Sequence, residues 1–282
     1  MKVTGWLVIN PRSGSYDADL VEAIKARFVE AGAPVARVIA LGDEELPDRA
    51  AVDSAGVDRI MILTGDGTIS ALATMLEGWD GELLVLPGGT MNLLARALHG
   101  EADALGIVGG VIAGTARAVT VPVVASEGFV AYAGVVAGPT SIWGDVREDM
   151  RNLDLAALAE SVPRALSATL AENEIAMEGH EERYTAVYLE PAETGIRAFG
   201  ILADHVGQLA AYGWAWVTGD FRNGPCEPLP VETRLVLRNL AGNAGIDLLV
   251  DGEKRRGANP MIFRQETSRL RFLSLLGRAD WS

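Results

Sequence analysis

The chain has 282 residues, 49% hydrophobic and 22% charged, so it has enough apolar side chains for a folded core, and its length favours two domains. Its 38 acidic residues outnumber 24 basic residues, and the formal net charge of −14 argues against DNA or RNA as a partner. The single cysteine, Cys226, excludes an intramolecular disulfide and fits a reducing compartment.

Two features predict a protein without membrane-embedded segments. Residues Met1–Gly5 lead directly into a strand-like run and carry no export signal. The longest apolar stretches, such as Gly128–Pro139, are shorter than the roughly 20 residues that a membrane span needs. We therefore expect a cytoplasmic protein without a transmembrane segment, which would meet an anionic membrane only through a local basic patch. The sequence leaves a homodimer open.

The first 120 residues alternate between strand-like and helix-like segments. Continuous apolar runs predict strands, and apolar positions at helical spacing predict the helices between them. The strands are expected at Gly5–Ile9, Val35–Leu41, Arg59–Leu63 and Glu82–Leu86, and the helices at Asp17–Ala31, Asp43–Ala55, Thr68–Leu76 and Met91–Leu98. This alternation predicts a three-layer α/β domain with a parallel sheet, whose ligands bind beyond the carboxyl ends of the strands.

Three turns rich in glycine, proline and small polar residues follow these strands: Asn10–Gly14, Gly65–Thr68 and Pro87–Asn92. We expect all three to face one crevice, because the carboxyl ends of parallel strands meet at one edge of a sheet. Glycine lets the backbone approach a ligand, and a helix N-terminus attracts phosphate. The same residues also suit ordinary turns in which Thr68 and Thr90 cap the next helices, a role compatible with phosphate binding.

The second turn carries the most informative side chain. Asp66 lies between Gly65 and Gly67 and is suited to hold the Mg²⁺ that accompanies a polyphosphate. We therefore interpret this turn as a nucleotide site. Arg12 offers a cation to a phosphate, and Arg96 is either a surface residue or a brace for the third turn.

After about Ala116 the pattern predicts an antiparallel β-sandwich. Strand-like runs recur at Arg117–Val124, Phe129–Val136, Tyr184–Glu190, Ile196–Ala203, Leu209–Val217, Thr233–Leu240 and Ile246–Val250. A helical stretch, Leu153–Glu172, interrupts them, and the last run, Arg269–Leu276, is expected to rejoin the first domain. The predicted domains are residues 1–120 with 267–282, and residues 121–266 with a helical insertion around 150–172.

The sequence Asp251-Gly252-Glu253 precedes Lys254 and two arginines. The simple interpretation is a hairpin turn with charged residues at an exposed tip. The functional interpretation makes Glu253 a general base for a substrate hydroxyl, with Lys254 near a phosphate or a lipid headgroup. The three histidines show no ligand spacing, so no zinc site is expected.

With these four motifs in order, nearly the whole chain resembles the diacylglycerol kinase catalytic-domain family, which includes bacterial lipid kinases and sphingosine kinases and is related in fold to NAD kinases. Asn10–Gly14 is similar to the family's Asn-Pro-x-Ser-Gly, and Gly65–Thr68 to its Gly-Gly-Asp-Gly-Thr, with Thr64 in place of the first glycine. Pro87–Asn92 resembles Pro-x-Gly-Thr-x-Asn, and Asp251-Gly252-Glu253 resembles the late Asp-Gly-Glu.

The resemblance implies a kinase that uses ATP and Mg²⁺ in a cleft between the two domains and phosphorylates a lipid hydroxyl, such as that of diacylglycerol, at the inner face of a membrane. It implies Asp66 at the metal and Glu253 as the base. Expected nucleotide-binding residues are Asn10, Gly65, Gly67, Thr68, Gly89, Thr90 and Asn92. Expected phosphate or headgroup contacts are Arg12, Arg96 and Lys254.

Three segments depart from the family pattern. Leu93-Leu94 follow Asn92 where lipid kinases carry an acidic or polar residue, Val136–Thr140 lacks an aspartate, and Gly219–Pro225 replaces a loop that holds a structural metal in some relatives. We therefore do not assign that metal site. Two alternatives stay open: a nucleotide- or lipid-binding protein that has lost catalysis, and a kinase for a soluble acceptor such as NAD.

Overall fold

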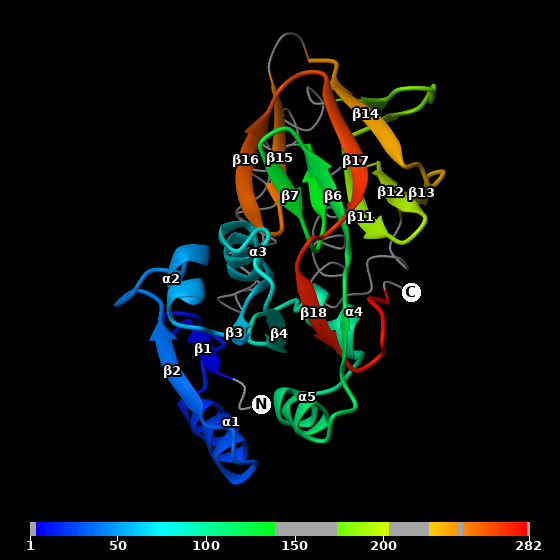
Figure 1. Cartoon of the computed structure of the whole chain (residues 1–282). Helices are drawn as coiled ribbons and strands as arrows, with labels where there is room; N and C mark the ends of the chain where they lie inside the picture. The colour runs from blue at the N-terminus through cyan, green and yellow to red at the C-terminus, as the bar shows by residue number, and fades with distance from the viewer. Residues whose placement is uncertain (1–3, 139–173, 203–225, 242–244, 281–282) are drawn as a thin grey trace, which may run out of the picture. The chain divides into compact units, whose positions relative to one another are not determined.

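The computed structural model describes residues 4–138, 174–202, 226–241 and 245–280. The chain divides into two compact units, Met1–Pro122 with Thr267–Ser282 and Val123–Glu266 (Figure 1). The expected helical insertion around 150–172, the expected strand Leu209–Val217 and the loop Gly219–Pro225 lie outside the described residues. None of the helices in the described part of the chain is long and apolar enough to cross a membrane.

The first unit contains a six-stranded sheet in the order β2-β1-β3-β4-β18-β5. Its strands are β1 (Gly5–Ile9), β2 (Val35–Ala40), β3 (Arg59–Thr64), β4 (Glu82–Pro87), β5 (Arg117–Val119) and β18 (Arg271–Ser274). The helices are α1 (Ala18–Glu30), α2 (Arg49–Ser54), α3 (Asp66–Met75), α4 (Leu93–His99) and α5 (Ala104–Ile112). All strands run parallel except β5, which pairs antiparallel with β18. The predicted parallel α/β sheet is confirmed.

Helices cover both faces of this sheet, which explains why its central strands are continuous apolar runs. Leu7 and Ile9 of β1 pack in one cluster with Ile24 of α1 and Ile107 of α5. Val8 points to the opposite face and is also fully buried. On that side α3 packs on β3, and α4 packs on β4 and β18. The turns that follow β1, β3 and β4 therefore start from a rigid base.

The second unit consists of two antiparallel sheets, as predicted. One has the order β10-β9-β14-β17-β6-β7 and the other β13-β12-β11-β8-β15-β16. The first sheet contains β6 (Pro122–Ser126), β7 (Phe129–Ala131), β9 (Ile175–Met177), β10 (Arg183–Tyr184), β14 (Arg234–Asn239) and β17 (Met261–Thr267). The second contains β8 (Val135–Ala137), β11 (Ala186–Ala192), β12 (Gly195–Ile201), β13 (Cys226–Pro228), β15 (Ile246–Val250) and β16 (Glu253–Gly257).

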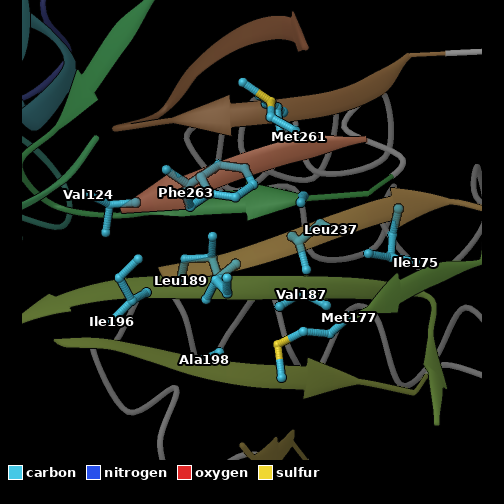
Figure 2. Packing of buried hydrophobic residues seen from close by; sticks show 14 of the residues in the cluster. Val124, Ile175, Met177, Val187, Leu189, Ile196, Ala198, Leu237, Met261 and Phe263 are labelled. Carbon is cyan, nitrogen blue, oxygen red and sulfur yellow. The ribbon is translucent and has the colours of Figure 1, made fainter. Parts of the chain in front are cut away.

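The core of the second unit lies between the two sheets. Figure 2 shows Phe263 and Leu237 of one sheet facing Leu189 and Ile196 of the other. Alternate residues of each strand point into this core, so the residues between them lie on the outer faces.

Three expected strands are each divided between different sheets. Arg117–Val124 contains β5 of the first unit and the start of β6, Phe129–Val136 contains β7 of one sheet and the start of β8 of the other, and Tyr184–Glu190 contains the end of β10 and most of β11. The second division lies next to Gly134, whose φ of 154° favours glycine. The sequence interpretation did not anticipate β9, β13, β16 or β17.

Candidate nucleotide site

The turns after β1, β3 and β4 meet at one edge of the first sheet. Gly65 and Gly89 pack backbone to backbone, since a Cβ atom on Gly89 would lie 2.6 Å from the Cα atom of Gly65. Gly88 is equally confined, because its Cβ atom would lie 2.5 Å from the carbonyl carbon of Leu63. Ser15 joins the first turn to the third by donating its hydroxyl to the Gly88 carbonyl oxygen at 2.7 Å. The structure thus brings the three turns together.

Asp66 links the second turn to the helix that follows the third turn. Its carboxylate accepts the N–H of Leu93 at 3.1 Å and the N–H of Leu94 at 3.2 Å, so it caps α4 from another element. A carboxylate has further lone pairs, and metal coordination is compatible with this capping role. The first N–H groups of α4 are therefore engaged by a carboxylate from another helix.

The starts of α3 and α4 differ from the expected ones. Helix α3 begins at Asp66 and its N-cap is Gly65, which has no side chain to cap it. The expected cap Thr68 is half-buried in the first turn of α3, where its N–H donates to the Gly65 carbonyl oxygen at 3.1 Å. The uncapped N-terminus of α3 therefore lies directly at the contact between the two glycine turns.

Asn92, and not Thr90, is the N-cap residue of α4. It has a left-handed backbone with φ of 51°, and its side chain bonds twice to Gly89: the Gly89 N–H donates to Oδ1 at 2.7 Å, and Nδ2 donates to the Gly89 carbonyl oxygen at 2.9 Å. These bonds close the third turn, while Thr90 is exposed. Asn tolerates this backbone conformation better than most residues, which explains its place here.

The side chains of the first turn point in different directions. Asn10 accepts the backbone N–H of Arg12 at 3.1 Å and so shapes the turn. The Arg12 guanidinium donates to the Gly42 carbonyl oxygen at 2.9 Å, so it packs on the loop after β2. Ser15 is the residue that reaches the third turn, and sequence reasoning missed it. Its only signal in the sequence is its place after Ser13-Gly14.

Arg96 does not brace the third turn in this structure. It lies in the last turn of α4 and forms an exposed ion pair with Glu101 at 2.8 Å.

His99, three residues further along α4, is buried, and neither ring nitrogen reaches a hydrogen-bond partner of good geometry among the described residues. Burial lowers the pKa of His99 from 6.5 to about 4, with a smaller opposing effect of the Val85 backbone.

The late Asp-Gly-Glu motif forms the hairpin between β15 and β16 in the second unit. Its Asp251 is buried, and the carboxylate accepts three backbone N–H groups, from Tyr132 at 2.8 Å, Ala133 at 2.7 Å and Gly134 at 2.8 Å. The hairpin is as expected, but the charged tip is not wholly exposed. Asp251 holds the hairpin to the segment where the chain passes from β7 to β8.

Glu253 begins β16 and is exposed, so its carboxylate is open to a substrate. Lys254 is also exposed and, as its neighbour on a strand, points to the opposite face. Asp251 thus positions the hairpin, whereas the side chain of Glu253 is exposed. No cluster of three or more metal-ligating His, Cys, Asp or Glu side chains occurs within the described ranges.

Comparison with known proteins agrees with this arrangement. The model of the diacylglycerol kinase catalytic domain matches residues 4–124. These residues belong to the diacylglycerol kinase catalytic-domain family. The matched segment contains the three strand-end turns. No curated protein matches the chain in sequence.

Two solved structures share the fold of the chain at low identity. A diacylglycerol kinase from Bacillus anthracis str. Sterne is 15% identical, with 96% of each chain covered and a TM-score of 0.62. Yeast NADH kinase, solved in complex with NADH, is 13% identical, with 100% of this chain and 84% of that chain covered and a TM-score of 0.50. At these identities the likeness concerns the fold alone.

Proposed function

We propose that this protein is an ATP- and Mg²⁺-dependent lipid kinase that phosphorylates a hydroxyl of diacylglycerol or a related lipid. The observation that carries the proposal is the convergence of three glycine-containing turns around Asp66 within a domain of the diacylglycerol kinase catalytic family. Phosphoryl transfer depends on positioning and charge neutralisation more than on covalent chemistry by the protein. A rigid turn cluster with one carboxylate is suited to that task.

The turn cluster fits a polyphosphate. Glycine at position 89 lets the second and third turns approach each other backbone to backbone at this edge of the sheet. The uncapped N-terminus of α3 favours negative charge. We assign nucleotide contacts to these turns through Asn10, Gly65, Gly67, Thr68, Gly89, Thr90 and Asn92. Bound with the nucleotide and held by Asp66, Mg²⁺ would neutralise phosphate charge.

Glu253 is the proposed general base. It would take the proton of the acceptor hydroxyl as the new oxygen–phosphorus bond forms and the bond between the γ-phosphorus and the ADP oxygen breaks. Its exposure and the buried anchor at Asp251 support this role, because the base must be both accessible and held in place. Lys254, Arg12 and Arg96 remain proposed phosphate or headgroup contacts, although Arg96 must leave Glu101 to act.

The test is incubation with γ-labelled ATP, Mg²⁺ and a total lipid extract, followed by identification of the labelled product. We expect label in the organic phase, and its loss in Asp66→Asn and Glu253→Gln. Asp19→Asn and Glu193→Gln, which change exposed carboxylates of the same two units, are matched controls.

Other outcomes of the same experiment would contradict the proposal. Unchanged turnover in Asp66→Asn or Glu253→Gln would remove the assigned roles. Phosphorylated NAD in the aqueous phase would identify a kinase for a soluble acceptor. ATP binding in calorimetry without ATP consumption on any lipid would identify a binding protein without catalysis.

A further inference from the structure

The outer face of the sheet that contains β14 and β17 carries an unusual group of arginines. In β14, Leu235 and Leu237 belong to the core, so Arg234, Val236 and Arg238 lie on the outer face, where the two arginines are exposed and Val236 between them is buried. In β17, Met261 and Phe263 belong to the core, so Ile262 and Arg264 lie on the outer face. We call Arg234, Val236, Arg238, Ile262 and Arg264 the arginine face.

The register of the two strands places like charges opposite each other. Arg234 pairs directly with Arg264, and Val236 pairs with Ile262. Arg238 lies further along β14, opposite Ala176 of β9 and about 13 Å from Arg234 at strand spacing. Like charges directly across two strands destabilise a sheet, so folding alone does not favour this arrangement.

These three arginines are exposed and form no ion pair with any residue in the described part of the chain. Carboxylates are nevertheless available on the same face. Glu178 follows β9 and donates its backbone N–H to the Val236 carbonyl oxygen, and Glu266 lies two residues beyond Arg264. Elsewhere in the unit arginines do pair with acids, as Arg183 does with Glu174 and Arg256 with Asp247.

The face thus carries three arginines against two nearby carboxylates, Glu178 and Glu266, whereas the formal net charge of the whole chain is −14. Three exposed arginines on one sheet face, with the buried Val236 and the half-buried Ile262 between them, match a surface that presents many phosphates. A single small anion would contact only part of it, because Arg234 and Arg238 are about 13 Å apart. Arginine also binds phosphate with two parallel hydrogen bonds, which favours lipid headgroups.

We propose that the arginine face docks on a membrane surface rich in anionic phospholipid. The inference builds on the lipid acceptor of the proposed function, but it concerns a separate surface and its test needs no nucleotide. Basic residues near an anionic membrane each contribute favourable electrostatic energy, whereas the rest of this acidic chain is repelled. The face thus selects the orientation in which the protein approaches the lipid.

The test is co-sedimentation of the whole chain with vesicles of phosphatidylcholine, with and without phosphatidylglycerol. We expect binding only to the phosphatidylglycerol vesicles, weakened by added salt. The triple variant Arg234→Gln/Arg238→Gln/Arg264→Gln should bind on the order of a hundredfold more weakly. Because the substitutions remove a like-charge pair, its melting temperature should stay equal or rise, which separates lost docking from lost folding.

A control with the same change of net charge is Arg27→Gln/Arg117→Gln/Arg271→Gln, which alters exposed arginines of the first unit. It should bind like the wild type. Equal losses in both triple variants, unchanged binding of the first variant, or no preference of the wild type for phosphatidylglycerol would overturn the proposal. A protein that docks but transfers no phosphate would keep this inference and refute the proposed function.

Discussion

Gly89 packs so closely on Gly65 that a Cβ atom on Gly89 would lie 2.6 Å from the Cα atom of Gly65. Backbone atoms of a neighbouring turn cannot rotate away as a side chain can. The two turns therefore act as one element, and their contact requires glycine at position 89, whereas a Cβ atom on Gly65 would lie at an ordinary 3.7 Å from the Cα atom of Gly89. This contact provides the most direct way to test whether the turn cluster works as a unit.

Gly89→Ala should separate the second and third turns. We expect a loss of about 1–3 kcal/mol in the free energy of unfolding, from overpacking of the backbone, and loss of the thermal stabilisation by ATP. Gly109→Ala is the control, because a Cβ at this helical position in α5 meets nothing within 4 Å and should be neutral or slightly stabilising. Equal melting temperatures of both variants would contradict the contact.

Asp66 should contribute to stability even without nucleotide. Asp66→Ala removes the acceptor of the Leu93 and Leu94 N–H groups and should cost about 0.5–2 kcal/mol, as for other lost helix caps. Asp66→Asn keeps one acceptor oxygen and should cost less. Urea unfolding of the apoprotein measures both. If the Asn variant is nearly as stable as the wild type but inactive, the lost activity reports on chemistry and not on folding.

The two carboxylates of the Asp-Gly-Glu motif should respond in opposite ways. Asp251→Asn leaves three buried N–H groups with one acceptor oxygen, and we expect a loss of about 2–4 kcal/mol. Glu253→Gln changes an exposed side chain and should alter stability by less than about 0.5 kcal/mol while reducing turnover. Denaturant unfolding combined with turnover measures both effects. A strongly destabilised Glu253→Gln variant would show that the second carboxylate is also structural.

Buried His99 should make the protein less stable in mild acid. Its pKa is about 4 in the folded chain and 6.5 as a free side chain, so between these values the unfolded chain binds a proton that the folded chain does not. The contribution of neutral His99 to the free energy of unfolding is fully present above pH 6.5 and falls by about 3 kcal/mol as the pH drops toward 4. His99→Leu should remove this slope in urea unfolding measured from pH 7.5 to 4.5. A parallel pH dependence of both proteins would disprove it.

The sequence predicted the elements that depend on local pattern. Residues Gly5–Ile9 form the expected strand because a strand buried on both faces must be apolar at every position, which the sequence displays directly. The convergence of the three turns also followed from the parallel order. The side-chain contacts between the turns could not be predicted in this way. Asp66 caps α4, which begins 27 positions later at Leu93, and no rule of local sequence spacing predicts that contact.

Sequence reasoning failed where tertiary contacts divide an apolar run. The segment 129–136 looks like one strand, but it leaves one sheet after Ala131 and enters the other at Val135. The carboxylate of Asp251, far along the chain, binds the backbone at this division. Its charge had suggested an exposed hairpin tip, because composition does not reveal that three N–H groups converge on it.

The position of β18 has a consequence for how the protein is made. This strand lies between β4 and β5, yet it follows the whole second unit along the chain. While the ribosome is still translating the second unit, the edge of β4 has no partner strand and offers unpaired backbone groups to other chains. Completion of the six-stranded sheet of the first unit is thereby delayed until residues 271–274 emerge.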